Sequence, residues 1–200
     1  MKGKKARRNL NNAYIDDMAG EMDRLGDAGL PLDGTCISDN VQESYWIDLP
    51  CGTRCELIQS TLTVCVSGGV IAVLTYLTSE GYAEPVIIVD RFFSQLSDRG
   101  KRFILAHESG HLYYGHIGSP EDAVAAAGES IEGVAIKHRD VKCEYQADQY
   151  AAQINGKKDT IAAMKEIRRL MAKNRWLDFD VLELNQRIRH LMQTQVKAAA

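Results

Sequence analysis

The sequence predicts an α+β fold, in which a small antiparallel sheet with an edge strand packs on a mainly helical core. Three stretches rich in β-branched residues lie in the first half of the chain, at residues 56–66, 70–78 and 85–90, and glycine-containing turns separate them. After Asp90, apolar residues recur at the three- and four-residue spacing of helices. A chain of 200 residues is long enough for one substantial core and too short for two.

The first third of the chain is less regular. A basic tail with five positive charges in its first eight residues precedes a helix predicted over residues 14–25. Residues 29–52 are rich in Gly, Pro, Asp and Ser, which predicts a loop with one brief strand near Trp46. We therefore divide the chain into a helix- and loop-rich extension at residues 1–57 and a main domain at residues 58–200.

Helices are expected to dominate the second half. Ser97 is a suitable N-cap for the first of them, which should end near Gly115 or Gly118, and a short helix and loop should follow up to residue 138. Asn155-Gly156 is a good helix stop. The later helices are predicted at residues 140–155, 160–173 and 180–196.

Composition excludes several classes of protein. A net charge of −3 gives no case for nucleic acid as a partner, although the basic tail could touch phosphates. The longest apolar stretch, residues 70–77, is far shorter than the roughly 20 residues of a membrane span. No apolar segment follows the basic start, as a secretory signal requires. An odd set of five cysteines favours a reducing compartment. We expect a soluble, cytoplasmic protein, and nothing indicates its oligomeric state.

The stretch AHESGH carries the chemistry. On a helix, His107 and His111 lie one turn apart and direct their imidazoles to one point, which is half of a tetrahedral zinc site. Glu108 is rotated by about 100° from His107, so its carboxylate can reach a metal-activated water without binding the metal. We predict Glu108 as the general base. The competing interpretation is an exposed helix with two unrelated histidines.

Zinc needs a third protein ligand, and a catalytic site keeps the fourth position for water. Glu144 and Asp148 are four apart on a predicted helix, so Glu144 can complete the ligand set while Asp148 accepts the outer N–H of a ligand histidine. The rival third ligands are Glu129, Glu132, His116 and His138. His116 should diverge from the metal, because it lies about 140° around the helix from His111.

Two segments resemble a known family. LSDRGKRFILAHESGHLYYGHI, followed by EYQADQYAAQINGKKDTIAAMKEI, looks like the HtpX and CAAX-prenyl-protease family of gluzincins, in which an HExxH helix precedes ExxxD. The likeness covers about residues 70–190. It implies a zincin-like core in which His107, His111 and Glu144 bind zinc, Glu108 is the base and Asp148 lies behind the ligands.

The resemblance also implies a substrate site. In this family an extended peptide pairs with an edge strand above the catalytic helix. The best local match is residues 71–78, and the positions expected to bind substrate through their backbone are Ile71, Ala72, Val73, Leu74 and Thr75. Unlike HtpX, this chain lacks apolar segments long enough to span a membrane, so it is closer to a soluble minigluzincin. It has Ser109 after the motif glutamate and no His-Pro before Arg187.

The expected function is a zinc-dependent endopeptidase that cleaves a peptide or protein substrate. The group that would stabilise the oxyanion is open, and the candidates are Tyr145, Tyr150, His138 and Arg187. Two alternatives remain: a catalytically silent or regulatory zinc-binding protein, and an ImmA-like protease specific for one regulator. A third possibility is that the extension is a cover that holds the enzyme latent through a thiolate of Cys36, Cys51 or Cys55, although ordinary loop or buried thiols explain these residues as well.

Overall fold

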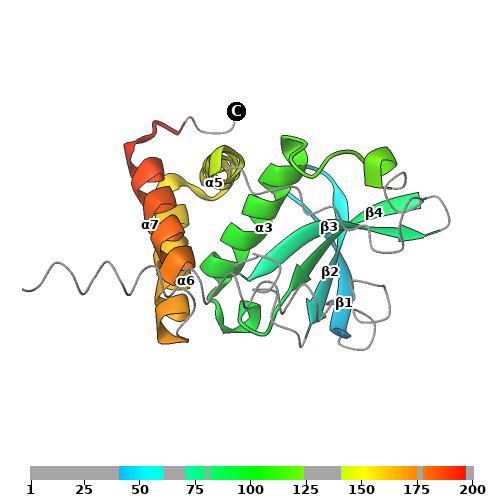
Figure 1. The fold of residues 1–200 in the computed structure, drawn as a ribbon, viewed down its shortest axis with the longest axis horizontal. Helices are drawn as coiled ribbons and strands as arrows, with labels where there is room; N and C mark the ends of the chain where they lie inside the picture. The colour runs from blue at the N-terminus through cyan, green and yellow to red at the C-terminus, as the bar shows by residue number, and fades with distance from the viewer. Residues whose placement is uncertain (1–40, 61–70, 80–81, 124–140, 175–177, 197–200) are drawn as a thin grey trace, which may run out of the picture.

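The computed structural model describes residues 41–60, 71–79, 82–123, 141–174 and 178–196. A four-stranded sheet comes first along the chain and helices follow it, so the α+β class is confirmed (Figure 1). The strands are β1 (Val41–Asp48), β2 (Arg54–Ser60), β3 (Ala72–Ser79) and β4 (Tyr82–Val89). The helices are a short 3-10 turn, η2 (Phe93–Gln95), then α3 (Asp98–Tyr113), α5 (Val141–Asn155), α6 (Lys157–Lys173) and α7 (Asp178–Gln193).

The sheet is mixed and has the strand order β1-β2-β4-β3. β1 pairs antiparallel with β2, and β3 pairs antiparallel with β4, but β2 and β4 run parallel, with Leu57 opposite Ile87. The expectation of a wholly antiparallel sheet is therefore wrong at this one pairing. The cause is the strand order. β3 is the edge strand and β4 lies between β3 and β2, so β4, which runs opposite to β3, runs in the same direction as β2. β4 is buried continuously from Val86 to Val89, as expected of an inner strand in a parallel pair.

The sheet begins before the predicted boundary at residue 57. β1 has eight residues where a brief strand was expected, and residue 57 lies inside β2. Both strands belong to the same sheet as β3 and β4, so residues 41–57 are part of the main fold. Residues 1–40, with the predicted helix at 14–25 and Cys36, lie outside the described residues. The same holds for residues 61–66, the end of the β-rich stretch predicted at 56–66.

Helix α3 begins where the sequence predicts and ends at Tyr113, shortly before the predicted stop at Gly115 or Gly118. The Ser97 side chain accepts a hydrogen bond from the Gly100 amide at 3.2 Å, which caps the first turn. Glu166 of α6 accepts from both the amide and the hydroxyl of Ser97, at 2.6 and 2.7 Å, and so joins this cap to α6. The chain leaves α3 through Gly115, whose φ of +68° favours glycine. α5, α6 and α7 agree with their predicted ranges to within about three residues.

Helix α3 lies between the sheet and the C-terminal helices (Figure 1). One continuous hydrophobic cluster joins Leu57 and Ile87 of the sheet to Phe103 of α3, Ile167 of α6 and Leu191 of α7. At Gly110 an added Cβ would lie 2.9 Å from the Ala147 Cα, so glycine allows α3 and α5 to approach closely. Over the ranges that the structure describes, no helix combines the length and apolar character needed to cross a membrane.

Candidate metal centre

Three predicted ligands meet where α3 crosses α5. The Nε2 atoms of His107 and His111 are 3.1 Å apart. From α5, one carboxylate oxygen of Glu144 lies 3.3 Å from His107 Nε2 and the other lies 3.5 Å from His111 Nε2. The close contact between Gly110 of α3 and Ala147 of α5 brings Glu144 within reach of the two histidines, because Ala147 lies about one turn after Glu144 on α5.

The spacing of these atoms fits a small tetrahedral ion. Zinc binds nitrogen and oxygen at about 2.0–2.2 Å, so neighbouring ligand atoms of a zinc tetrahedron are roughly 3.3–3.6 Å apart. Here the two Nε2 atoms are 3.1 Å apart, and each of them has one of the two Glu144 oxygens at 3.3 or 3.5 Å. In the described part of the chain, these three residues form the one group of His, Cys, Asp and Glu side chains close enough to share a metal ion. The structure thus supports a metal site, and the donor set suits zinc.

Asp148 occupies the position expected of it behind His107. Its Oδ1 is 3.0 Å from His107 Nδ1, which leaves Nε2 directed toward Glu144. A carboxylate on the outer nitrogen fixes the orientation and tautomer of a ligand histidine. Both Asp148 and Glu144 are almost completely buried.

Arg187 of α7 neutralises the two buried carboxylates. Its Nε and Nη2 donate to the two Asp148 oxygens at 2.9 and 2.7 Å, a bidentate pair. Its Nη1 lies 2.7 Å from Glu144 Oε2. The sequence named Arg187 as an oxyanion candidate, and its role as the counter-ion of the ligand carboxylate was missed. Its position on the same helical face as the buried Leu184 and Ile188 was a usable signal, since a buried arginine requires an acidic partner.

The two ligand histidines have opposite pKa shifts. For His107, burial and the nearby Arg187 favour the neutral form, but hydrogen bonds to Asp148 and Glu144 outweigh both and raise the pKa to about 9. For His111, burial and the neighbouring His107 lower the pKa to about 3. Burial by itself would raise the pKa of the Asp148 carboxyl, but the Arg187 guanidinium beside it holds that pKa below its usual range. At neutral pH the metal-free site therefore holds a charged imidazolium at His107 and a neutral imidazole at His111.

Glu108 is buried beside the ligands without belonging to their group. It lines a small cavity of about 30 Å³ together with His107, Arg187, Ile71 and Ala72. A cavity of this size accommodates about one water molecule. The neighbour of Glu108, Ser109, accepts a hydrogen bond at 2.9 Å from the Cys51 amide, so the turn between β1 and β2 contacts α3 next to Glu108.

His116 is outside the group of metal-binding atoms, as predicted. It still contacts a member of that group, because its Nδ1 is 3.0 Å from the outer nitrogen of His111, Nδ1. Helical rotation does not predict this contact, since α3 ends at Tyr113 and the chain reverses at Gly115. The hydrogen bond from the His116 amide to the His111 carbonyl, at 2.9 Å, closes this reversal.

The remaining oxyanion candidates are not brought to the ligands. The Tyr145 ring stacks on His190, with centroids 3.9 Å apart, and the Tyr150 ring packs against Tyr113 and Tyr114. Residues 124–140, with His138 and the rival ligands Glu129 and Glu132, lie outside the described residues.

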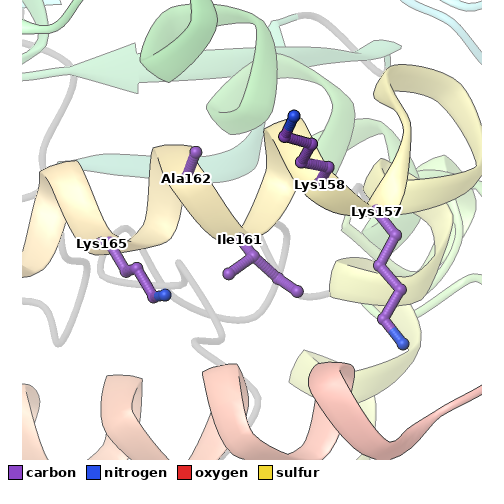
Figure 2. Close-up of a pocket in the computed structure, with 5 residues that line it drawn as sticks. All are labelled: Lys157, Lys158, Ile161, Ala162 and Lys165. Atoms are coloured by element: carbon purple, nitrogen blue, oxygen red, sulfur yellow. The ribbon is translucent and has the colours of Figure 1, made fainter.

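The described cysteines are free thiols, as the sequence suggests, and neither Cys51 nor Cys55 belongs to the metal-binding group. Cys55 is buried in β2, and burial, with Cys51 and Glu108 nearby, raises its pKa to about 12. A surface hollow of about 530 Å³ has none of the site residues in its lining, which consists of Lys157, Lys158, Ile161, Ala162 and Lys165 of α6 (Figure 2).

The expected substrate positions lie at the edge of the sheet. β3 is the last strand in the sheet order, so one side of its backbone pairs with β4 and the other pairs with no strand in the described ranges. Ile71 and Ala72, at its start, line the cavity beside Glu108, whereas Val73, Leu74 and Thr75 continue along the strand. Comparison with protein-family models, with curated proteins and with solved structures finds no match to this chain.

Proposed function

We propose that this protein is a zinc-dependent endopeptidase of the gluzincin type. The observation that carries the proposal is the placement of His107, His111 and Glu144, whose potential ligand atoms all lie within 4.8 Å of one another, with Asp148 on the outer nitrogen of His107. The family resemblance of the two motifs, described above, supports the same conclusion.

Charge balance supports a divalent ion. Without metal, the buried charged groups of the site are Arg187 and protonated His107 on one side and Glu108, Glu144 and Asp148 on the other, which leaves one negative charge; Glu183, 3.9 Å from Arg187, is less deeply buried and is not counted. A divalent ion that displaces the His107 proton brings three positive charges against three negative ones. Since unbalanced charge is costly in a buried site, the site favours a doubly charged cation.

Each residue then has a role in peptide hydrolysis. Zinc held by His107, His111 and Glu144 would lower the pKa of a bound water to about 7 and polarise a carbonyl group. Glu108 accepts the proton of the attacking water and returns it to the leaving amine. Asp148 holds His107 with Nε2 toward the metal, and Arg187 holds Asp148 and Glu144. Of the oxyanion candidates that the structure describes, Arg187 is the one in contact with the ligand residues, so we propose it for that role as well.

The substrate is proposed to be an extended peptide. The side of β3 that pairs with no strand in the described ranges offers backbone donors and acceptors to such a chain, a form of β-augmentation. Because Ala72 lines the cavity beside Glu108, a peptide bound at the start of β3 would lie near the base.

The test combines metal content with cleavage. Purified wild type should bind one zinc ion and cleave casein or a peptide library, and Glu108→Gln should keep the zinc and lose turnover. Glu121→Gln is the matched control, because Glu121 is exposed and outside the site, and its activity should equal that of wild type. Protein that binds no zinc after chelator treatment and reloading would overturn the proposal.

The small cavity favours a second candidate, a zinc-binding protein without peptidase activity. A space of about 30 Å³ holds a water but no peptide group, and the most exposed ligand side chain, His111, is only 12% accessible. Zinc bound by wild type with no cleavage of any substrate in a diverse peptide library would support this candidate. Cleavage of one protein alone would support a protease specific for a single regulator.

A further inference from the structure

The surroundings of His111 hold a hydrogen-bond chain that leads from the proposed metal site to the surface of α5. His111 Nδ1 lies 3.0 Å from His116 Nδ1, and His116 Nε2 lies 3.0 Å from Gln146 Oε1. Both distances are within hydrogen-bonding range. The inner nitrogen of His111, Nε2, faces His107 and Glu144.

His116 is held in this position from several directions. Its amide donates to the His111 carbonyl, and Gly115, with φ +68°, turns the chain back toward α3. Its ring stacks on Tyr114, with centroids 5.6 Å apart and an interplanar angle of 22°. The ring thus has little freedom to leave His111, although neither His116 nor Gln146 belongs to the metal-binding group.

The direction of the chain determines which nitrogen of His111 carries the proton. The Gln146 carbonyl oxygen can only accept, so the facing Nε2 of a neutral His116 must be the protonated nitrogen. Its Nδ1 is then an acceptor and takes the Nδ1–H of His111. This leaves a lone pair on His111 Nε2, the form required of a metal ligand.

We propose that His116 and Gln146 are positioning residues that fix the tautomer of His111, as Asp148 does for His107. This inference rests on the proposed zinc site. It means that both proposed ligand histidines have a dedicated partner on their outer nitrogen, Asp148 for His107 and His116 for His111. Removal of such an outer partner typically weakens metal binding by about 10–100-fold.

The first experiment is ¹⁵N NMR of the histidine rings in metal-free, full-length protein at pH 7.5. We expect His111 to be protonated at Nδ1 and His116 at Nε2. Gln146→Lys replaces the acceptor with a donor and should reverse both tautomers, whereas Gln146→Glu should preserve them. The inference is overturned where His111 is protonated at Nε2 in wild type, or where Gln146→Lys leaves both rings unchanged.

The second experiment measures zinc affinity by competition with a chromophoric chelator. His116→Ala and Gln146→Lys should each bind zinc about 10–100-fold more weakly than wild type, and Gln146→Glu should bind at least as tightly. Gln153→Lys is the charge control, because Gln153 lies two turns along the same face of α5, about 10 Å away. It should keep nearly wild-type zinc affinity. Equal losses of zinc affinity in Gln153→Lys and Gln146→Lys would refute the proposed role of the hydrogen-bond chain.

These two measurements separate the proposal about the hydrogen-bond chain from the peptidase proposal. A wild type that takes up no zinc contradicts the metal site itself, while the ring tautomers of the metal-free protein still decide the direction of the chain. A wild type that binds zinc without cleaving peptides contradicts the peptidase and leaves the affinity test intact. Because Gln146 is exposed, its variants test the chain even if His116→Ala does not fold.

Discussion

Replacement of Arg187 tests how the buried acids of the site are stabilised. Arg187 is 5% exposed and makes three contacts of 2.7–2.9 Å with Asp148 and Glu144, which are themselves 1% and 2% exposed. Arg187→Met keeps much of the side-chain volume and removes the charge. Each hydrogen bond to a charged group contributes about 1.5–3 kcal/mol, but protonation of one carboxylate offsets part of the loss. We therefore expect the metal-free protein to lose about 3–5 kcal/mol, the usual effect of breaking a buried ion pair.

The assay is urea unfolding of the metal-free protein at pH 7, followed by circular dichroism and fluorescence. Arg189→Met is the matched control, because Arg189 lies on the same helix and is exposed, and its stability should change by less than about 0.5 kcal/mol. Arg187→Lys keeps the charge and loses the bidentate geometry, so it should fall between wild type and Arg187→Met. Equal losses in Arg187→Met and Arg189→Met would refute the reasoning.

Three further predictions concern protons, helix packing and capping. Because the pKa of His107 is raised to about 9, its contribution to the stability of the metal-free protein is complete below about pH 6.5 and is lost as pH rises through 9. Zinc must displace this proton, so calorimetry in buffers of different ionisation enthalpy should show about one proton released per zinc at pH 7; no release would contradict the assigned shift. Gly110→Ala forces α3 and α5 apart, because the Ala147 backbone blocks the new methyl group. It should lower the free energy of unfolding in urea by about 1–3 kcal/mol and should also weaken zinc binding. An unchanged zinc affinity would show that the contact does not set the position of Glu144. Ser97→Ala removes the cap of α3 and should cost about 0.5–2 kcal/mol by the same assay, without loss of bound zinc.

Local patterns predicted the parts of the site that depend on helical spacing. His107 and His111 share a face because they are four residues apart, and the same holds for Glu144 and Asp148. The α+β class and the four longer helices also follow from local signals, such as the Ser97 cap. Spacing could further suggest that the two pairs meet, since zinc requires a third ligand.

The parts that the sequence did not predict depend on contacts between distant segments. The parallel pairing of β2 with β4 depends on which strand takes the middle of the sheet, and no turn signal specifies that. The return of His116 to His111 depends on where α3 unwinds, because helical rotation no longer applies beyond its last turn.

The sequence by itself determined the ligand types and their spacing along two helices, since these are properties of a single helical turn. Only the tertiary structure decided how these helices meet, which residue neutralises the buried acids and what lies behind each imidazole. Arg187 is 39 residues from Asp148 along the chain, and packing of α7 against α5 alone brings them together. Burial then makes the pairing obligatory, because a carboxylate without a counter-ion is costly in a dry interior.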